Sequence, residues 1–208
     1  MIIVLVFHYY LLYLAFDFSN MLELVYPLEP LPVIFGSSTG PASEMLPVIE
    51  PSGLVAGQAS RNVCHERSLL HPVVRLLVLD RSGRFFFQKR SASKELFPSL
   101  WDDAVTGHVV FGENLSEALY REAAEEIGLR QFHPQHLATY LCNEGGEREM
   151  VNLYAAVGEF NLDPHNDEVE CGRWWTADEV GKSLDAGEFT PGMVFDWKNF
   201  KDKALALL

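Results

Sequence analysis

The sequence predicts an α/β domain built on a mixed β-sheet that is covered on both faces. Three observations lead to this prediction. Short apolar runs of strand length are bounded by turn residues. Several of these runs form pairs joined by tight turns, as in hairpins. Helical patterns interrupt the series of strands, so other strands must be joined by longer connections.

The elements become recognisable after a turn-rich linker at residues 36–43. A turn at residues 51–53 separates the first two short runs, and another at residues 80–83 joins the next two as a hairpin. The strands predicted ahead of the first long helix are residues 46–49, 54–59, 71–79, 84–90 and 101–109.

The first long helix is predicted over residues 115–127, where both of its ends carry clear signals. Asn114 and Glu117 have the spacing of a capping box, and Gly128 is a suitable C-terminal stop. After it come a hairpin, a short strand, a helix capped by Thr176 and a final helix that begins at Pro191. The predicted hairpin strands are residues 137–143 and 150–160, and the short strand is residues 172–175.

The N-terminal segment from Met1 to Phe16 is uncharged and rich in β-branched and aromatic residues. It is shorter than the roughly 20 apolar residues of a membrane span and lacks the basic region of a signal peptide. It could form an added strand, pack on the domain as a hydrophobic arm, or precede a natural start at Met21 or Met45. The last alternative makes residues 1–44 dispensable and leaves residues 45–208 as the domain.

Composition narrows the function further. A formal net charge of −13 disfavours nucleic-acid binding, because the chain would repel a phosphate backbone. Small phosphorylated ligands can still bind where divalent cations bridge the negative charges. The three cysteines form no close pair, which favours reduced thiols and a cytoplasmic protein with no membrane partner.

The helix over residues 115–127 breaks its own apolar pattern. Leu115 and Leu119 define the face that should enter the core, yet two turns later the same stripe continues as Glu122 and Glu126. Glu125 lies close beside them. Acidic residues in an apolar stripe violate ordinary patterning, and clustered carboxylates repel one another. A bound Mg²⁺ would stabilise them, because it takes oxygen ligands from carboxylates and phosphates. The alternative is a solvated helix face.

The 23 residues from Gly107 to Leu129 resemble the signature box of the Nudix hydrolases without a mismatch. The resembling positions are Gly107, Glu113, Arg121, Glu122, Glu125, Glu126, Ile127, Gly128 and Leu129. The looser likeness extends from about residue 46 to residue 200. It implies an α/β/α sandwich, a small-molecule diphosphate substrate and cleavage of its diphosphate linkage. Members of the family often dimerise, so a homodimer is one expected assembly.

The resemblance also assigns roles to side chains. Glu122, Glu125 and Glu126 would hold Mg²⁺ or Mn²⁺ across the diphosphate; the alternative is that one of them polarises the attacking water. Arg121 would orient Glu122 through a charge-assisted contact. The carbonyl of Gly107 is a further metal-ligand candidate.

Three candidates lie outside the box. In many Nudix enzymes a glutamate in the region of Glu168 supplies another metal ligand or the base; the alternative here is an acidic surface loop. Lys89 and Arg90 end a predicted strand and are candidates for binding the substrate phosphates, although a solvated strand end is an equal alternative.

A second resemblance, to isopentenyl diphosphate isomerases of the same fold, rests on residues 70–71, 91–94, 97–101 and 107–108. Those isomerases bind a metal through histidines and glutamates, and four residues fall at similar positions: His71, His108, Glu149 and Glu168. They also carry a catalytic cysteine where this chain has Thr106, whose hydroxyl is a far weaker acid. Hydrolysis is therefore the favoured prediction over isomerisation.

A third alternative is a Nudix-fold domain that only binds a nucleotide and regulates another process. Such domains usually lose box carboxylates, whereas this chain keeps them all. The substrate is not specified by the sequence. Four aromatic residues could stack on a base or belong to the core: Phe97, Trp101, Phe111 and Tyr140.

Overall fold

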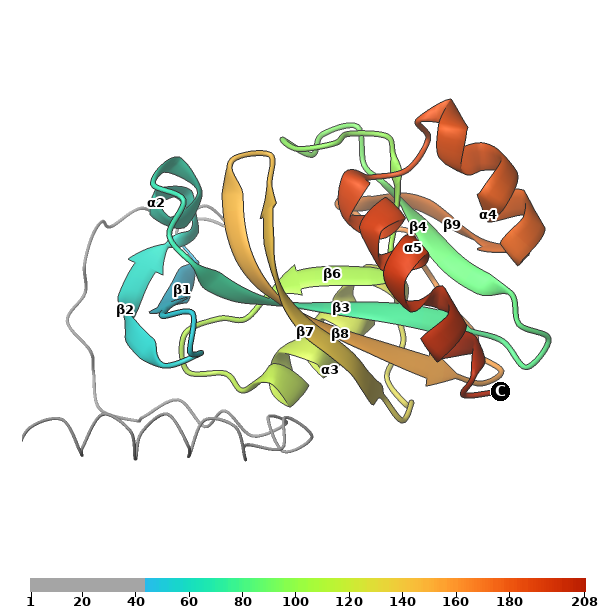
Figure 1. Ribbon diagram of the computed structural model, residues 1–208, viewed down its shortest axis with the longest axis horizontal. Coiled ribbons are helices and arrows are strands. Elements are labelled where there is room, and N and C mark those ends of the chain that lie inside the picture. Colours follow the sequence, from blue (N-terminus) through green and yellow to red (C-terminus); the bar gives the residue numbers. More distant parts are fainter. Residues whose placement is uncertain (1–43) are drawn as a thin grey trace, which may run out of the picture.

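The computed structural model describes residues 44–208, which fold as a sheet between two helical layers (Figure 1). The predicted mixed α/β architecture is confirmed. The strands of the seven-stranded sheet are β3 (His71–Leu79), β4 (Phe85–Arg90), β5 (Trp101–Asp102), β6 (Val105–His108), β7 (Gln135–Glu144), β8 (Glu147–Val157) and β9 (Val169–Trp175). A separate hairpin consists of β1 (Met45–Ile49) and β2 (Val55–Ser60). The helices are α2 (Arg61–Glu66), α3 (Leu115–Ile127), α4 (Ala177–Ser183), η3 (Leu184–Ala186) and α5 (Pro191–Leu205).

Strand β3 is the centre of the sheet, and every residue in it is buried. It pairs in parallel with β8 and antiparallel with β4 and β6, so the sheet is mixed. Alternate side chains enter two separate cores, as expected for a strand covered on both faces. Val74 and Leu76 pack on the side of α3, whereas Val73 and Leu77 pack on the side of α4 and α5.

Helix α3 spans the predicted residues because local signals fix both of its ends. The Asn114 side chain accepts a hydrogen bond from the Glu117 backbone, and the Glu117 side chain accepts one from the Asn114 backbone. Gly128 adopts the left-handed conformation, with φ of 68°, which glycine adopts at no steric cost. The helices that follow Thr176 and begin at Pro191 are also present.

The prediction of one strand over residues 101–109 was wrong. Strand β5 pairs with β4, while β6 pairs with β3, so the chain changes neighbours between Asp102 and Val105. The six-residue helix α2 was not predicted, because it is too short to display a helical period. Strand β8 also begins at Glu147, three residues before its predicted start.

The predictions about Met1–Phe16 and the linker at residues 36–43 fall outside the described residues. Within residues 44–208, no helix is long and apolar enough to span a membrane.

Candidate active site

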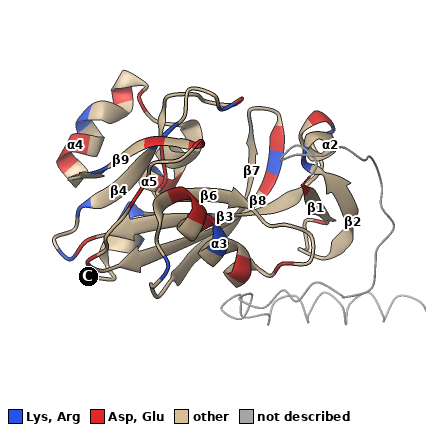
Figure 2. Cartoon of the chain, turned by 180° about the vertical axis from the view of Figure 1, so that it is seen from behind, with Lys and Arg blue, Asp and Glu red and all other residues tan. Residues whose placement is uncertain are grey.

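The acidic end of α3 lies against the short strand β6 (Figure 2). The first turns of the helix bury Leu115 and Leu119, and the same side of the helix then buries Glu126, which is 6% exposed. Glu125 points outward, with 61% of its side chain exposed. The carboxylate of Glu126 therefore lies in the protein interior, on the apolar side of α3, as the sequence pattern indicated.

Glu126 is held by neutral donors. Its Oε2 accepts hydrogen bonds from the backbone N–H of Thr106 at 2.9 Å and from Nε2 of Gln88 at 3.0 Å. Burial raises the pKa of Glu126 to about 8, and the neighbouring Glu122 adds to this rise. A buried carboxylate in such a position favours the approach of a cation.

Glu122 is fixed by Arg121, as expected from the box. The Nη1 of Arg121 donates to Glu122 Oε1 at 2.8 Å and to Glu125 Oε2 at 3.1 Å. The same guanidinium binds Glu113 through Nε at 2.7 Å and donates to the carbonyl of His108 at 3.0 Å. Burial raises the pKa of Glu122 to about 7, although Arg121 acts in the opposite direction.

Gly107 lies directly under Glu122. A Cβ atom at this position would be 2.0 Å from Cδ and 2.3 Å from Oε1 of Glu122. Glycine is therefore required for the carboxylate to approach the backbone of β6 so closely.

A second group of possible metal ligands lies on the opposite face of β6. The ligand atoms of His65, His71 and His108 lie within 4.8 Å of one another. Among residues 44–208, no other group of three or more His, Cys, Asp or Glu side chains brings its ligand atoms this close together. His71 comes from β3 and His108 from β6, where the second resemblance placed them. His65 comes from α2 and was missed, because that helix was not predicted.

The ring nitrogens of the three histidines lie close together. Nδ1 of His71 bonds the Leu69 carbonyl at 2.8 Å, so it carries the proton, and the buried Nε2 has no partner among the described residues. Nε2 of His65 and Nε2 of His108 face each other at 3.3 Å. Burial lowers the pKa of His71 to about 4 and that of His108 well below its usual value, so both rings are neutral at pH 7. Neutral imidazoles with converging lone pairs suit a metal ion.

Two glutamates complete this histidine centre, which we define as His65, His71, His108, Glu147 and Glu149. Glu147 contacts Nδ1 of His65 at 2.9 Å, and Glu149 lies beside Glu147 on β8. Burial raises the pKa of Glu149 to about 7, against the opposing effect of Arg75. Glu147 was missed because it was predicted to lie in the hairpin loop, whereas it begins β8.

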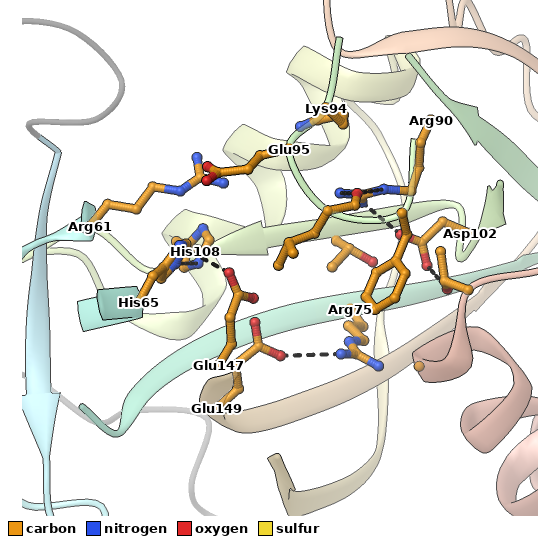
Figure 3. Close-up of a pocket in the computed structure, with 15 residues that line it drawn as sticks. Arg61, His65, Arg75, Arg90, Lys94, Glu95, Asp102, His108, Glu147 and Glu149 are labelled. Carbon is orange, nitrogen blue, oxygen red and sulfur yellow. Dashed lines mark hydrogen bonds and ion pairs between the residues drawn. The ribbon is translucent and has the colours of Figure 1, made fainter. Parts of the chain in front are cut away.

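A cavity of about 110 Å³ adjoins the histidine centre (Figure 3). Its wall carries four cationic side chains: Arg61, Arg75, Arg90 and Lys94. Leu96 and Phe97 contribute an apolar part of the wall from the loop after β4. The cavity and the box carboxylates lie on opposite sides of β6, although the charge of Lys94 still acts on Glu126.

The predicted site residues outside the box differ in where they lie. Lys89 does not line this cavity and pairs with Glu170 at 3.2 Å. Arg90 does line it, and its guanidinium binds Asp102 at 2.8 Å and the Leu96 carbonyl. Glu168 pairs with Lys94, and its backbone N–H donates to Asn166. The Asn166 side chain in turn donates to the backbone carbonyls of Glu125 and Glu126, so this loop lies against the end of the box helix. Lys94 was not among the predicted phosphate-binding residues.

The comparisons with known proteins agree with the box. The family model described as NUDIX domain matches residues 69–197. An uncharacterized Nudix hydrolase of Streptomyces coelicolor is 32% identical over 155 residues, which cover 72% of this chain and 84% of the relative. The chain belongs to the Nudix hydrolase family. An isopentenyl-diphosphate Delta-isomerase of Brevibacterium linens is 27% identical over 162 residues, with coverage of 73% and 88%.

The same fold occurs among solved structures. The crystal structure of DR0079 from Deinococcus radiodurans aligns with a TM-score of 0.64 and 25% sequence identity. The alignment covers 77% of this chain and 99% of that one.

Proposed function

We propose that this Nudix hydrolase cleaves the diphosphate linkage of a nucleoside diphosphate derivative or related compound, with Mg²⁺ or Mn²⁺ at the box. The observation that carries the proposal is the pair Glu122 and Glu126, whose pKa values burial raises to about 7 and about 8. Ionising two such buried carboxylates on one helix is costly, and a hard divalent cation would supply the positive charge that balances them.

The donor set fits such a cation. Glu122, Glu125 and Glu126 offer carboxylate oxygens, and the carbonyl of Gly107, whose backbone lies against Glu122, is the proposed further donor. When bound, the metal would neutralise charge on the diphosphate oxygens and make a water nucleophilic. Arg121 holds Glu122 in place, and the Thr106 N–H and Gln88 hold Glu126. Glu168, which is paired with Lys94, is the proposed additional ligand or base.

For the substrate phosphates, Lys94 is the best-placed cation of the cavity wall, because its charge acts on Glu126 at the box. Arg90, proposed for this role from the sequence, lines the same cavity, and Arg61 lies across from it (Figure 3). Lys89 is the weaker candidate because it does not line the cavity. Of the four aromatic candidates, Phe97 lines the cavity, while Trp101 and Tyr140 pack against other aromatic rings. The three cysteines are free thiols, which supports the proposed cytoplasmic location.

Isomerisation of a small diphosphate is the second candidate function, and the histidine centre favours it. The isomerase of Brevibacterium linens is a relative over most of its length. Thr106 argues against this reaction, because its hydroxyl replaces the acidic thiol that the isomerase resemblance requires. Hydrolysis remains the proposal that the intact box supports.

A substrate panel tests the proposal. It contains nucleotide sugars, ADP-ribose, dinucleotides, coenzyme A, NADH, nucleoside triphosphates and isopentenyl diphosphate, each with and without Mg²⁺ or Mn²⁺. We expect metal-dependent hydrolysis of at least one compound and a loss of about 100-fold or more in kcat for Glu126→Gln. Glu159→Gln, at an exposed position, is the matched control. Full turnover by Glu126→Gln would refute the carboxylate mechanism, and isomerisation without any hydrolysis would favour the second candidate.

A further inference from the structure

A buried chain of charged side chains connects the histidine centre to the last helix. Arg75, on β3, donates from Nη2 to Glu149 Oε2 at 3.2 Å and from Nη1 to Asp196 Oδ2 at 3.3 Å. The Arg75 side chain is 7% exposed, and that of Asp196 on α5 is fully buried. One guanidinium thus bridges a carboxylate of the histidine centre and a carboxylate that no part of the proposed hydrolysis uses.

Stability alone is a poor reason for this arrangement. Taking an arginine and two carboxylates out of water is costly, and apolar residues of similar volume often stabilise a protein as well or better. The network also interrupts an apolar layer, because Val73 and Leu77 on the same face of β3 pack in the core beneath α5. The position of Arg75 between Glu149 and Asp196 points to a role in the site.

We propose that Asp196 is a positioning residue that orients Arg75 and, through it, directs Glu149 at a divalent cation in the histidine centre. The inference rests on the proposed ability of that centre to bind metal. Side chains that orient a metal ligand in this way contribute strongly to affinity, and their loss typically weakens metal binding about 10- to 100-fold.

Asp196 has two polar neighbours, Tyr140 and Asp103. The hydroxyl of Tyr140 donates to Asp196 Oδ1 and lies 3.4 Å from Nη1 of Arg75. Asp103 is completely buried beside Asp196. Burial, together with the charges of Asp196 and Asp102, raises the pKa of Asp103 well above its usual value. Of these two aspartates, Asp196 is the one that accepts a bond from Arg75, so Asp196 is the aspartate that orients the guanidinium.

The two aspartates consequently differ in what an asparagine should do. Asp196→Asn weakens the contact that holds Arg75 and frees the guanidinium to shift, whereas Asp103→Asn leaves that contact in place. A merely structural role would not separate the two substitutions by metal affinity, because both sites are fully buried.

The test uses the full chain and Co²⁺, whose absorption spectrum reports coordination by histidine. We expect Asp196→Asn to weaken Co²⁺ binding about 10- to 100-fold. We expect Asp103→Asn to change it by less than about 3-fold, and Tyr140→Phe to produce an intermediate loss. Asp80→Asn is a control for reduced stability, because Asp80 is a buried carboxylate bonded only within its own turn. Circular dichroism checks that each variant is folded.

Equal Co²⁺ affinity in wild type and Asp196→Asn would overturn the inference, as would equal losses in Asp196→Asn and Asp103→Asn. If Asp196→Asn does not fold, Tyr140→Phe decides, and an unchanged affinity in that variant overturns the inference. A histidine centre that binds no metal is recognised separately. In that case the Co²⁺ spectra of the wild type and His71→Ala are the same, and the inference is overturned together with its premise.

Discussion

Replacement of Gly107 by alanine should disable the box while the domain stays folded. The new Cβ would lie 2.0 Å from Cδ of Glu122, whereas carbon atoms in contact are separated by about 3.5 Å. Gly107 is paired with Val74 inside the sheet, so its backbone cannot retreat. The Glu122 carboxylate must therefore move by about 1.5 Å and lose its 2.8 Å contact with Arg121. Because a misplacement of about 1 Å can cost roughly 100-fold in rate, we expect kcat to fall at least about 100-fold.

The assay is steady-state hydrolysis of the best substrate from the panel, measured with saturating Mg²⁺ or Mn²⁺ and accompanied by thermal unfolding. Gly181→Ala is the matched control, because a Cβ at Gly181 meets no atom within 4 Å. A Gly107→Ala enzyme that keeps kcat within about 3-fold of wild type would refute the reasoning. Loss of folding in that variant would instead show that the Glu122 side chain cannot yield at all.

The remaining predictions concern stability. Gly181→Ala should stabilise the protein by about 0.5–1 kcal/mol, measured by denaturant unfolding, because Gly181 lies inside α4 with room for a methyl group. Asp80→Asn should destabilise it by about 2 kcal/mol at pH 7, since Ser82 and Arg84 donate four hydrogen bonds to this carboxylate. Burial raises the pKa of Asp80, but those bonds outweigh burial and leave it below the usual value. The stabilisation is thus present above about pH 4 and lost as pH falls through the lowered pKa, so wild type and variant should converge in acid.

The box could be predicted from the sequence because its signals are local. Helical periodicity alone placed Glu122 and Glu126 on the face defined by Leu115 and Leu119, and the structure buries Glu126 on that side. The helix ends were also fixed locally, by Asn114 and Gly128. Such features depend on spacing within one element, which a single sequence displays.

The histidine centre could be predicted only in part, because it is assembled from distant elements. His71 and His108 were suggested by likeness to the isomerases. His65 lies on the short helix α2, and Glu147 lies at the start of β8. In the sequence, Arg75 is a charged residue within an apolar strand. No local pattern indicates that Asp196, 121 residues later, binds it. Such pairings arise from tertiary packing, which leaves no local period.

Strand β6 explains how two sites can share one small domain. Its four residues alternate in direction, so Val105 and Gly107 face α3, while Thr106 and His108 face the cavity. Its backbone is also used by the box, since Glu126 accepts from the Thr106 N–H and Arg121 donates to the His108 carbonyl. The same peptide units therefore hold the box side chains on one face and direct His108 on the other. A shift of this strand by a fraction of an ångström would alter both sets of ligands, which couples the geometry of the box to that of the histidine centre.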